Sequence, residues 1–295
     1  MSKRHIQSRL LASYVRDPSA VIGSIILGVF ILAALLAPWI TPQNPYDLEK
    51  VSLEHFLTPP VWMEGGQMPF LLGTDDQGRG ILSTIIYGCR TSLVVGFSVV
   101  LIAGTFGVVI GLLAGYYGGW LDAVMMRLAD TLFAFSTTFM AFLFLGLFGG
   151  ASILVVIIAI CMADWVRYAR TMRGSVLEVK ENAYIMAAKA TGAKDIRLLL
   201  RHLLPNAIPP IFVVVAVDLA VVIMLEATLS FLGVGVPLTE PSLGLMISIG
   251  KNYIYAGLWW MIVFPGAALV LLVVGINLFA DWLREELNPK LERRA

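Results

Sequence analysis

The chain has 295 residues, of which 58% are hydrophobic and only 14% are charged. Soluble domains carry about a quarter charged residues and are about half apolar, so this composition indicates a membrane protein. The net charge of +1 excludes the strong basic excess that is typical of nucleic-acid-binding proteins. The only cysteines, Cys89 and Cys161, provide neither a disulfide framework nor the spacing of a metal site.

Six apolar stretches are candidates for membrane-spanning helices, which need about 20 residues each. In chain order they cover residues 21–40, 92–115, 128–148, 151–163, 207–232 and 259–278. The first stretch follows four basic residues, but it is longer than the apolar part of a cleavable signal peptide, which has about 7–15 residues. We therefore expect six spans, the first of them an uncleaved anchor.

The basic residues are divided unevenly between the two sides that six spans define. Of the 21 Lys and Arg residues, 17 lie on the side of the N-terminus and 4 on the opposite side. Cytoplasmic segments are the ones enriched in Lys and Arg. Both termini and the segment between spans four and five are therefore predicted to be cytoplasmic. The proline-rich segment after the first span is predicted to be an irregular lobe on the outer side.

The cytoplasmic segment 164–205 is patterned rather than featureless. Asn182 can cap a short helix over residues 183–191, and Gly192 can end that helix in a left-handed conformation. The alanines of this helix give it little side-chain bulk, which suits close docking. A second helix is expected from residue 194 or 195 to Pro205, with leucines at 198, 199, 203 and 204 on one face.

This segment resembles the "EAA" loop of binding-protein-dependent ABC importer permeases. The family pattern is Glu-Ala-Ala, three residues, Gly, nine residues, Ile, any residue, Leu-Pro. The chain matches it without a gap from Ala187 to Pro205, with Met186 in place of Glu and His202 in place of Ile. Further segments are similar to the "C" subunits of the dipeptide, oligopeptide and nickel permeases; they are residues 72–79, 87–93, 201–206, 226–233, 264–266, 277–284 and 288–291.

The resemblance implies an all-α membrane protein of the bacterial inner membrane, with six transmembrane helices in the type I ABC importer permease fold. Residues 1–90 would be the anchor helix and the extracytoplasmic lobe. Residues 91–295 would be the ABC transporter type-1 transmembrane domain, with five helices and the coupling loop 164–205. The implied cargo is peptide, although longer peptides, glutathione-like compounds and nickel chelates stay open beside dipeptides.

The resemblance also implies a division of labour among several chains. The partners would be a second homologous permease, two ATP-binding subunits, an extracytoplasmic solute-binding protein and membrane lipid, with no nucleic acid. The chain contains no Gly-x-x-x-x-Gly-Lys-[Ser/Thr] phosphate loop. We therefore expect a transport subunit that is no enzyme and holds no cofactor, with ATP bound by the partner subunits. The helix seated in the ATPase would consist of Asn182, Ala183, Tyr184, Ile185, Met186, Ala187, Ala188, Ala190 and Thr191, ending at Gly192.

Two acidic residues lie inside the fifth apolar stretch, where an ionisable side chain is costly and is a functional candidate by default. Asp218 and Glu226 are separated by about 12 Å along a helix and about 80° around it. They are candidates for the translocation path, or else they are paired with polar neighbours. They also define the alternatives to an ATP-driven importer, because a proton-coupled secondary transporter could use them as its relay. A membrane scaffold without transport activity is the third hypothesis.

Glycines at 104, 107, 111 and 115 repeat near helical spacing in the second apolar stretch. Small residues three or four positions apart allow two helices to approach closely in lipid. We therefore expect the second span to pack tightly against a neighbour.

Overall fold

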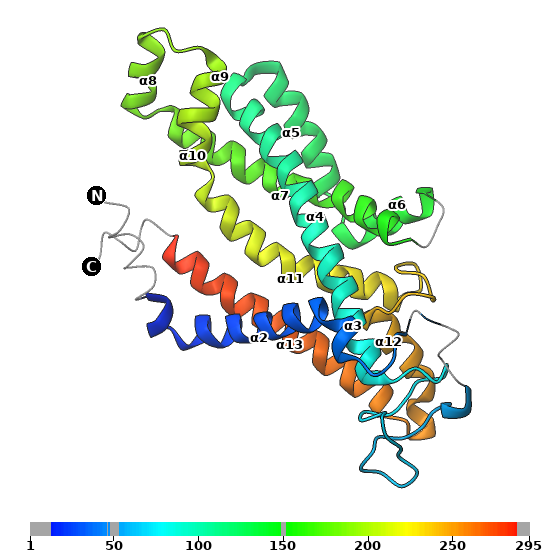
Figure 1. Ribbon diagram of the computed structural model, residues 1–295. Helices are drawn as coiled ribbons and strands as arrows, with labels where there is room; N and C mark the ends of the chain where they lie inside the picture. Colours follow the sequence, from blue (N-terminus) through cyan, green and yellow to red (C-terminus); the bar gives the residue numbers. More distant parts are fainter. Residues whose placement is uncertain (1–12, 46, 48–52, 149–151, 288–295) are drawn as a thin grey trace.

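The computed structural model describes residues 13–45, 47, 53–148 and 152–287. Within those ranges the chain forms helices and irregular segments, with a single isolated bridge between Thr74 and Gly80. The short helix α8 lies at one end of the molecule and the irregular segment before α4 lies at the other, with long helices running between them (Figure 1).

The helices follow the predicted apolar stretches with several changes of boundary. In chain order they are α2 (Pro18–Leu35), α3 (Ala37–Ile40), η1 (Leu53–His55), α4 (Ile81–Tyr117), α5 (Gly119–Phe133), α6 (Thr137–Phe148), α7 (Ile153–Lys180), α8 (Ala183–Ala190), α9 (Asp195–Leu198), η2 (Leu199–Leu203), α10 (Leu204–Ala207), α11 (Pro209–Phe231), α12 (Leu243–Gly250), η3 (Lys251–Ala256) and α13 (Trp260–Glu286).

Four helices, α2, α4, α11 and α13, are each long and apolar enough to cross a membrane. They correspond to the first, second, fifth and sixth predicted spans. The first span ends at Leu35 rather than at residue 40. Pro38, in the short helix α3 that follows, has no N–H group to donate, so α2 cannot continue through it as a regular α-helix. Helix α4 begins at Ile81, well before the predicted start at residue 92.

The third predicted span, residues 128–148, is not one continuous helix. Helices α5 and α6 replace it, and their axes are bent by 94°. Both helices pack on α7. Helix α5 carries Asp122 and Asp130, which bind Arg173 and Arg170 of α7, whereas α6 is apolar after its first two residues, Thr137 and Thr138. Charged pairs thus hold α5 to α7, while α6 contributes apolar side chains to the core.

The fourth predicted span, residues 151–163, is the apolar beginning of α7. This helix continues without a break to Lys180. The first part of the segment 164–205 is thus helical as far as Lys180. The segment between α11 and α13 contains a helix, α12, that was not predicted from the sequence.

Among the described helices, α4 and α7 make the most extensive contact, at the glycine repeat of α4. A Cβ atom on Gly107 would lie 2.4 Å from the Trp165 carbonyl oxygen, and one on Gly111 would lie 2.3 Å from the Ala169 carbonyl oxygen. Neither position has room for a side chain. The tight packing of the second span is therefore confirmed, and its partner is α7.

The main hydrophobic core lies among α4, α7 and α11, and it extends to the helices around η2. Helix α2 packs mainly along α13 and also contacts α4, and α2 and α13 run side by side in Figure 1. Helix α11 contacts α4, α7 and α13. This central position places its two carboxylates, Asp218 and Glu226, inside the protein, where they are 1% and 0% exposed.

Candidate functional site

Helix α8 forms where the sequence predicts it and ends as predicted. Asn182 occupies the N-cap position with extended backbone, although its side chain makes no capping hydrogen bond. At the other end Gly192 is left-handed, with φ of +80°. Its N–H donates to the Lys189 carbonyl at 3.0 Å, and the Ala193 N–H donates to the Ala188 carbonyl at 3.2 Å. These two hydrogen bonds form a complete Schellman motif, which fixes the end of the helix.

Most of α8 faces solvent. Ile185 is 3% exposed and anchors the helix, whereas Met186 is 58% exposed and Tyr184 is 46% exposed. The remaining predicted positions are Asn182, Ala183, Ala187, Ala190, Thr191 and Gly192, all exposed, and Ala188, which is half-buried. A short helix with one buried anchor and a surface of alanines offers a flat face to a partner.

The helix after α8 starts at Asp195, as expected, but it is not regular. Residues 199–203 form a π-helical turn, η2, between the short helices α9 and α10. Pro205 explains the irregularity, because it lacks an N–H and its ring clashes with the carbonyl group of Arg201 in a regular α-helix. Leu198, Leu199 and Leu203 are buried, as the leucine pattern predicts.

Asp218 belongs to a polar cluster between α7 and α11. Arg167 binds one carboxylate oxygen of Asp218, and the Tyr168 hydroxyl donates to the other at 2.7 Å. Arg167 also lies 3.5 Å from a carboxylate oxygen of Asp164, whose second oxygen is buried and has no hydrogen-bond partner among the described residues. The carboxylate of Asp218 is therefore fully paired, while Arg167 is one third exposed.

Glu226 is held by hydroxyl groups and not by a cation. Ser92 donates to one carboxyl oxygen at 2.7 Å, and Ser230 and Ser242 each donate to the other at 2.8 Å. The three serines come from α4, from α11 and from the residue before α12. Because buried polar groups need partners, this network fastens three helices to one another. It gives Glu226 a structural role.

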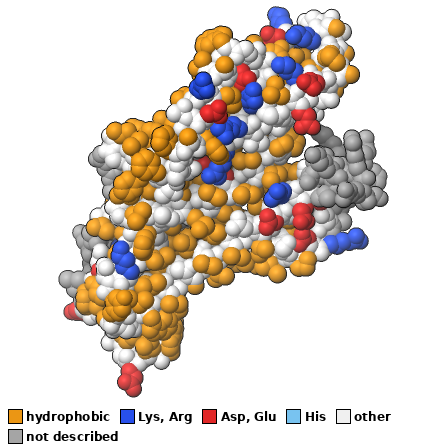
Figure 2. Space-filling model, turned by 180° about the vertical axis from the view of Figure 1, so that it is seen from behind, with side chains coloured by type: hydrophobic (Ala, Val, Ile, Leu, Met, Phe, Trp, Pro, Cys, Tyr) orange, Lys and Arg blue, Asp and Glu red, His pale blue; other side chains and the backbone are white. Residues whose placement is uncertain are grey.

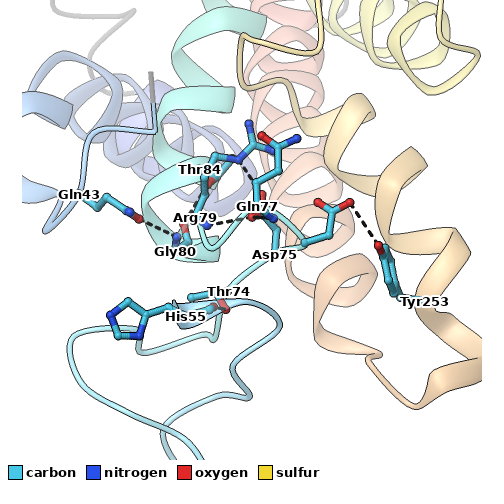
Figure 3. Close-up of polar contacts among 10 residues, drawn as sticks. Gln43, His55, Thr74, Asp75, Gln77, Arg79, Gly80, Thr84 and Tyr253 are labelled. Atoms are coloured by element: carbon cyan, nitrogen blue, oxygen red, sulfur yellow. Dashed lines mark hydrogen bonds and ion pairs between the residues drawn. The ribbon is translucent and has the colours of Figure 1, made fainter. Parts of the chain in front are cut away.

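A third polar cluster lies at the start of α4, at the end of the molecule away from α8. The carboxylate of Asp75 accepts hydrogen bonds from the backbone N–H groups of Gln77 and Arg79, both at 2.9 Å, and pairs with the Arg79 guanidinium at 2.7 Å (Figure 3). The Gln43 side chain accepts from the Gly80 N–H at 2.9 Å. These contacts fix the irregular segment against the first turn of α4.

Asp76 links this cluster to the segment after α12. The Tyr253 hydroxyl lies 3.3 Å from one oxygen of the Asp76 carboxyl group, while its other oxygen is buried and has no partner among the described residues. Burial, and then the neighbouring Asp75 charge, raise the pKa of Asp76 above its ordinary value of 3.8. The Asp76 charge raises the pKa of Tyr253 in turn.

Sequence reasoning found Asp218 and Glu226 but not the groups that bind them. The sequence could have shown Arg167 as a partner of Asp164, three positions before it on one helix, but not as a partner of Asp218. The serines around Glu226 carry no such signal, since they come from segments far apart in sequence. No group of three or more His, Cys, Asp or Glu side chains in the described part of the chain is placed to hold a metal ion.

Residues 107–293 match the family model of the binding-protein-dependent transport system inner membrane component. The chain belongs to this family. Residues 9–60 also match the N-terminal transmembrane domain of oligopeptide transport permease C. The predicted family and its inner-membrane location are thereby confirmed.

Alignments with curated relatives extend over almost the whole chain. The dipeptide transport system permease protein DppC of Haemophilus influenzae is 36% identical over 280 residues, which span 95% of this chain and 93% of that protein. The di/tripeptide transport system permease protein DppC of Pseudomonas aeruginosa is 35% identical over 283 residues, or 96% of this chain and 92% of that protein. The dipeptide permease DppC of Escherichia coli is 36% identical over 280 residues, or 95% and 92%.

Two solved structures share the fold. The MetNI methionine ABC transporter in inward-facing conformations aligns with a TM-score of 0.56 at 18% identity, over 69% of this chain and 96% of that one. An amino acid ABC transporter crystallised with histidines aligns with a TM-score of 0.54 at 17% identity, over 72% and 95%. The predicted all-α type I ABC importer permease fold is confirmed.

Proposed function

We propose that this chain is the permease subunit of an ATP-driven importer of peptides, coupled to separate ATPase subunits through residues 182–192. The observation that carries the proposal is α8, an exposed short helix with alanines on its surface and a single buried anchor, Ile185. A protein of the permease family needs a docking element for its source of energy, and α8 has the size, exposure and fixed ends of one. The names of the relatives support peptide as the cargo.

The distribution of charge supports the orientation that we propose. Lys and Arg side chains gather at the end of the molecule that carries α8, and hydrophobic side chains cover much of the rest of the face shown (Figure 2). By the preference of basic residues for the cytoplasm, α8 and both termini lie on the cytoplasmic side. The irregular segment before α4 and the segment between α11 and α13 lie outside, where a solute-binding protein would deliver the peptide.

In the proposed assembly a second permease completes the path, and two ATPase subunits bind ATP and drive the cycle. The chain itself performs no chemistry, and solute choice rests mainly with the binding protein. Asp218 and Glu226 as path residues stay a prediction. The proton-coupled alternative gains no support, because Arg167 and Tyr168 pair with Asp218 and serine hydroxyls surround Glu226.

The test is substitution of Gly192, assayed as ATP-driven peptide uptake by the assembled importer in proteoliposomes. A Cβ atom at this position would have no atom within 4 Å, so a larger residue would meet no steric clash there. Its cost would come only from the left-handed backbone conformation. Gly192→Val should disrupt the end of α8 and abolish uptake, because a β-branched residue is strained at positive φ. Gly192→Asn is the matched control and should retain uptake, because asparagine tolerates this conformation. Full uptake by Gly192→Val would refute the coupling role of residues 182–192.

A further inference from the structure

Both ends of the α8 segment are tied to one turn of α4. Lys180 is the last residue of α7, just before α8, and its ammonium group lies 3.2 Å from the carbonyl oxygen of Gly115 and 3.3 Å from that of Tyr116. Asp195 is the first residue of α9, just after α8, and its carboxylate accepts a 2.6 Å hydrogen bond from the Tyr116 hydroxyl. The two contacts therefore meet at residues 115 and 116, near the end of α4.

Helix chemistry explains the Lys180 contact. Helix α4 ends at Tyr117, and the last carbonyl groups of a helix have no partner within it. A cation at this point satisfies those carbonyls and also favours the negative end of the helix dipole. The Tyr116 contact is charge-assisted, since a hydroxyl donates to a carboxylate, and such hydrogen bonds are stronger than neutral ones.

Packing alone holds α8 only weakly. Ile185 is its single buried residue, and a cavity of about 490 Å³ separates α8 from the end of α4, lined by Tyr116, Tyr117, Lys180, Ile185, Met186, Lys189, Asp195 and Leu198. A close-packed helix would leave no such space. Beyond the packing of α7 on α4, the position of α8 relative to α4 therefore depends on the two polar contacts that flank it.

Helix α4 connects the two ends of the molecule. Its 37 residues span about 55 Å at 1.5 Å per residue, well beyond the roughly 30 Å of a bilayer core. At its other end the first turn is fixed to the Asp75–Arg79 cluster and to Gln43. A displacement of its last turn is thus carried along one helix to the segment on the opposite side.

We propose that Lys180 and the Tyr116–Asp195 pair form a clamp that transmits movement of α8 to α4. This inference rests on the proposed function, because it assumes that an ATPase moves α8. The three side chains are positioning residues, since they contact neither solute nor nucleotide. Without the clamp, ATPase closure moves α8 across the cavity beneath it and leaves α4 behind, so that ATP is hydrolysed without import.

The experiment measures ATP hydrolysed per peptide imported by the complete importer in proteoliposomes. Tyr116→Phe removes one hydroxyl and keeps the ring, and Lys180→Met removes the ammonium and keeps the chain length. Tyr117→Phe is the matched control, because the neighbouring Tyr117 side chain is 55% exposed. Lys180→Arg restores a cation and should restore coupling. Docking of α8 is read separately, as the yield of a cross-link from Met186→Cys to the ATPase subunits.

Tyr116→Phe should raise the number of ATP molecules used per peptide about fivefold, the effect of one lost hydrogen bond on a two-state equilibrium. Lys180→Met, which loses two contacts, should raise it at least as much. Cross-linking and ATPase content should match the unaltered importer. An unchanged ratio in both Tyr116→Phe and Lys180→Met, while Gly192→Val still abolishes uptake, overturns the clamp and leaves the proposed function standing. Loss of the cross-link in the clamp variants also overturns it, since the residues then serve docking. Absence of ATP-driven uptake in the unaltered importer refutes the proposed function itself.

Discussion

Replacing Gly111 by alanine should push α4 and α7 apart. The new Cβ atom would lie 2.3 Å from the Ala169 carbonyl oxygen, whereas real Cβ atoms essentially never approach within 3.0 Å of another heavy atom. The helices must therefore separate locally by about 0.7 Å, and a gap of this size forfeits a quarter to a half of each dispersion contact beside it. Overpacking of this kind costs about 1–3 kcal/mol, and packing is the main force between helices in lipid.

Gly104→Ala is the matched control on the same helix. There the new Cβ atom would meet the Tyr168 ring at 3.4 Å, an ordinary van der Waals distance. Both substitutions gain the same helix propensity, about 1 kcal/mol. The difference in melting temperature between the two variants therefore reports the clash alone. Thermal unfolding of the purified importer can be followed by the reactivity of Cys89, which is 1% exposed in the folded chain. Gly111→Ala should melt at least about 2 °C below Gly104→Ala, and equal melting temperatures would refute the packing argument.

Three further predictions concern the buried carboxyl groups. Glu226→Leu should destabilise the protein by about 1–3 kcal/mol for each serine hydroxyl left without an acceptor, and Glu226→Gln by much less, as thermal unfolding would show. Asp218→Leu should cost about 2–3 kcal/mol, because it removes the acceptor of the Tyr168 hydroxyl and one of the two carboxylates beside Arg167. The double variant with Tyr168→Phe should cost less than the sum of the two single variants, and additive costs would contradict the pairing. Because burial and the neighbouring Asp75 charge raise the pKa of Asp76, Asp76 contributes to the stability of the fold below pH 3.8, and this contribution is lost as the pH rises through the higher folded-state pKa. The protection factors of residues 53–80 against hydrogen exchange, which are corrected for the intrinsic rate at each pH, should therefore fall between acid and neutral pH, and Asp76→Asn should abolish that fall.

The sequence predicted most of the elements that depend on local patterns. The ends of α8 followed from Asn182 and Gly192, because a cap and a left-handed residue are properties of single positions. The close approach along α4 followed from glycine spacing in the same way. The split of the third span was not predicted, since it depends on how each half packs against α7. The apolar pattern of residues 139–148 is the same whether the helix continues straight or bends.

The partners within the polar clusters could not be predicted from local patterns either. An acidic residue in an apolar stretch is visible in the sequence, so Asp218 and Glu226 could be selected. Their partners lie 51 residues away for Arg167 and 134 residues away for Ser92, and only the packing of α4, α7 and α11 brings them together. The clamp is similar, because Tyr116 and Asp195 lie 79 residues apart. Local pattern therefore located the proposed coupling element, and tertiary structure was needed to show what holds it.

The most direct test of the proposed function is transport by the purified assembly. The chain would be extracted from its own membranes in mild detergent, with every subunit that co-purifies identified and reconstituted into proteoliposomes. Uptake of a labelled dipeptide would then be measured with ATP available to the ATPase subunits and no proton gradient. We expect a second permease and ATPase subunits to co-purify, and uptake to require ATP and the binding protein. Uptake by the chain alone, driven by a proton gradient and indifferent to ATP, would contradict the account.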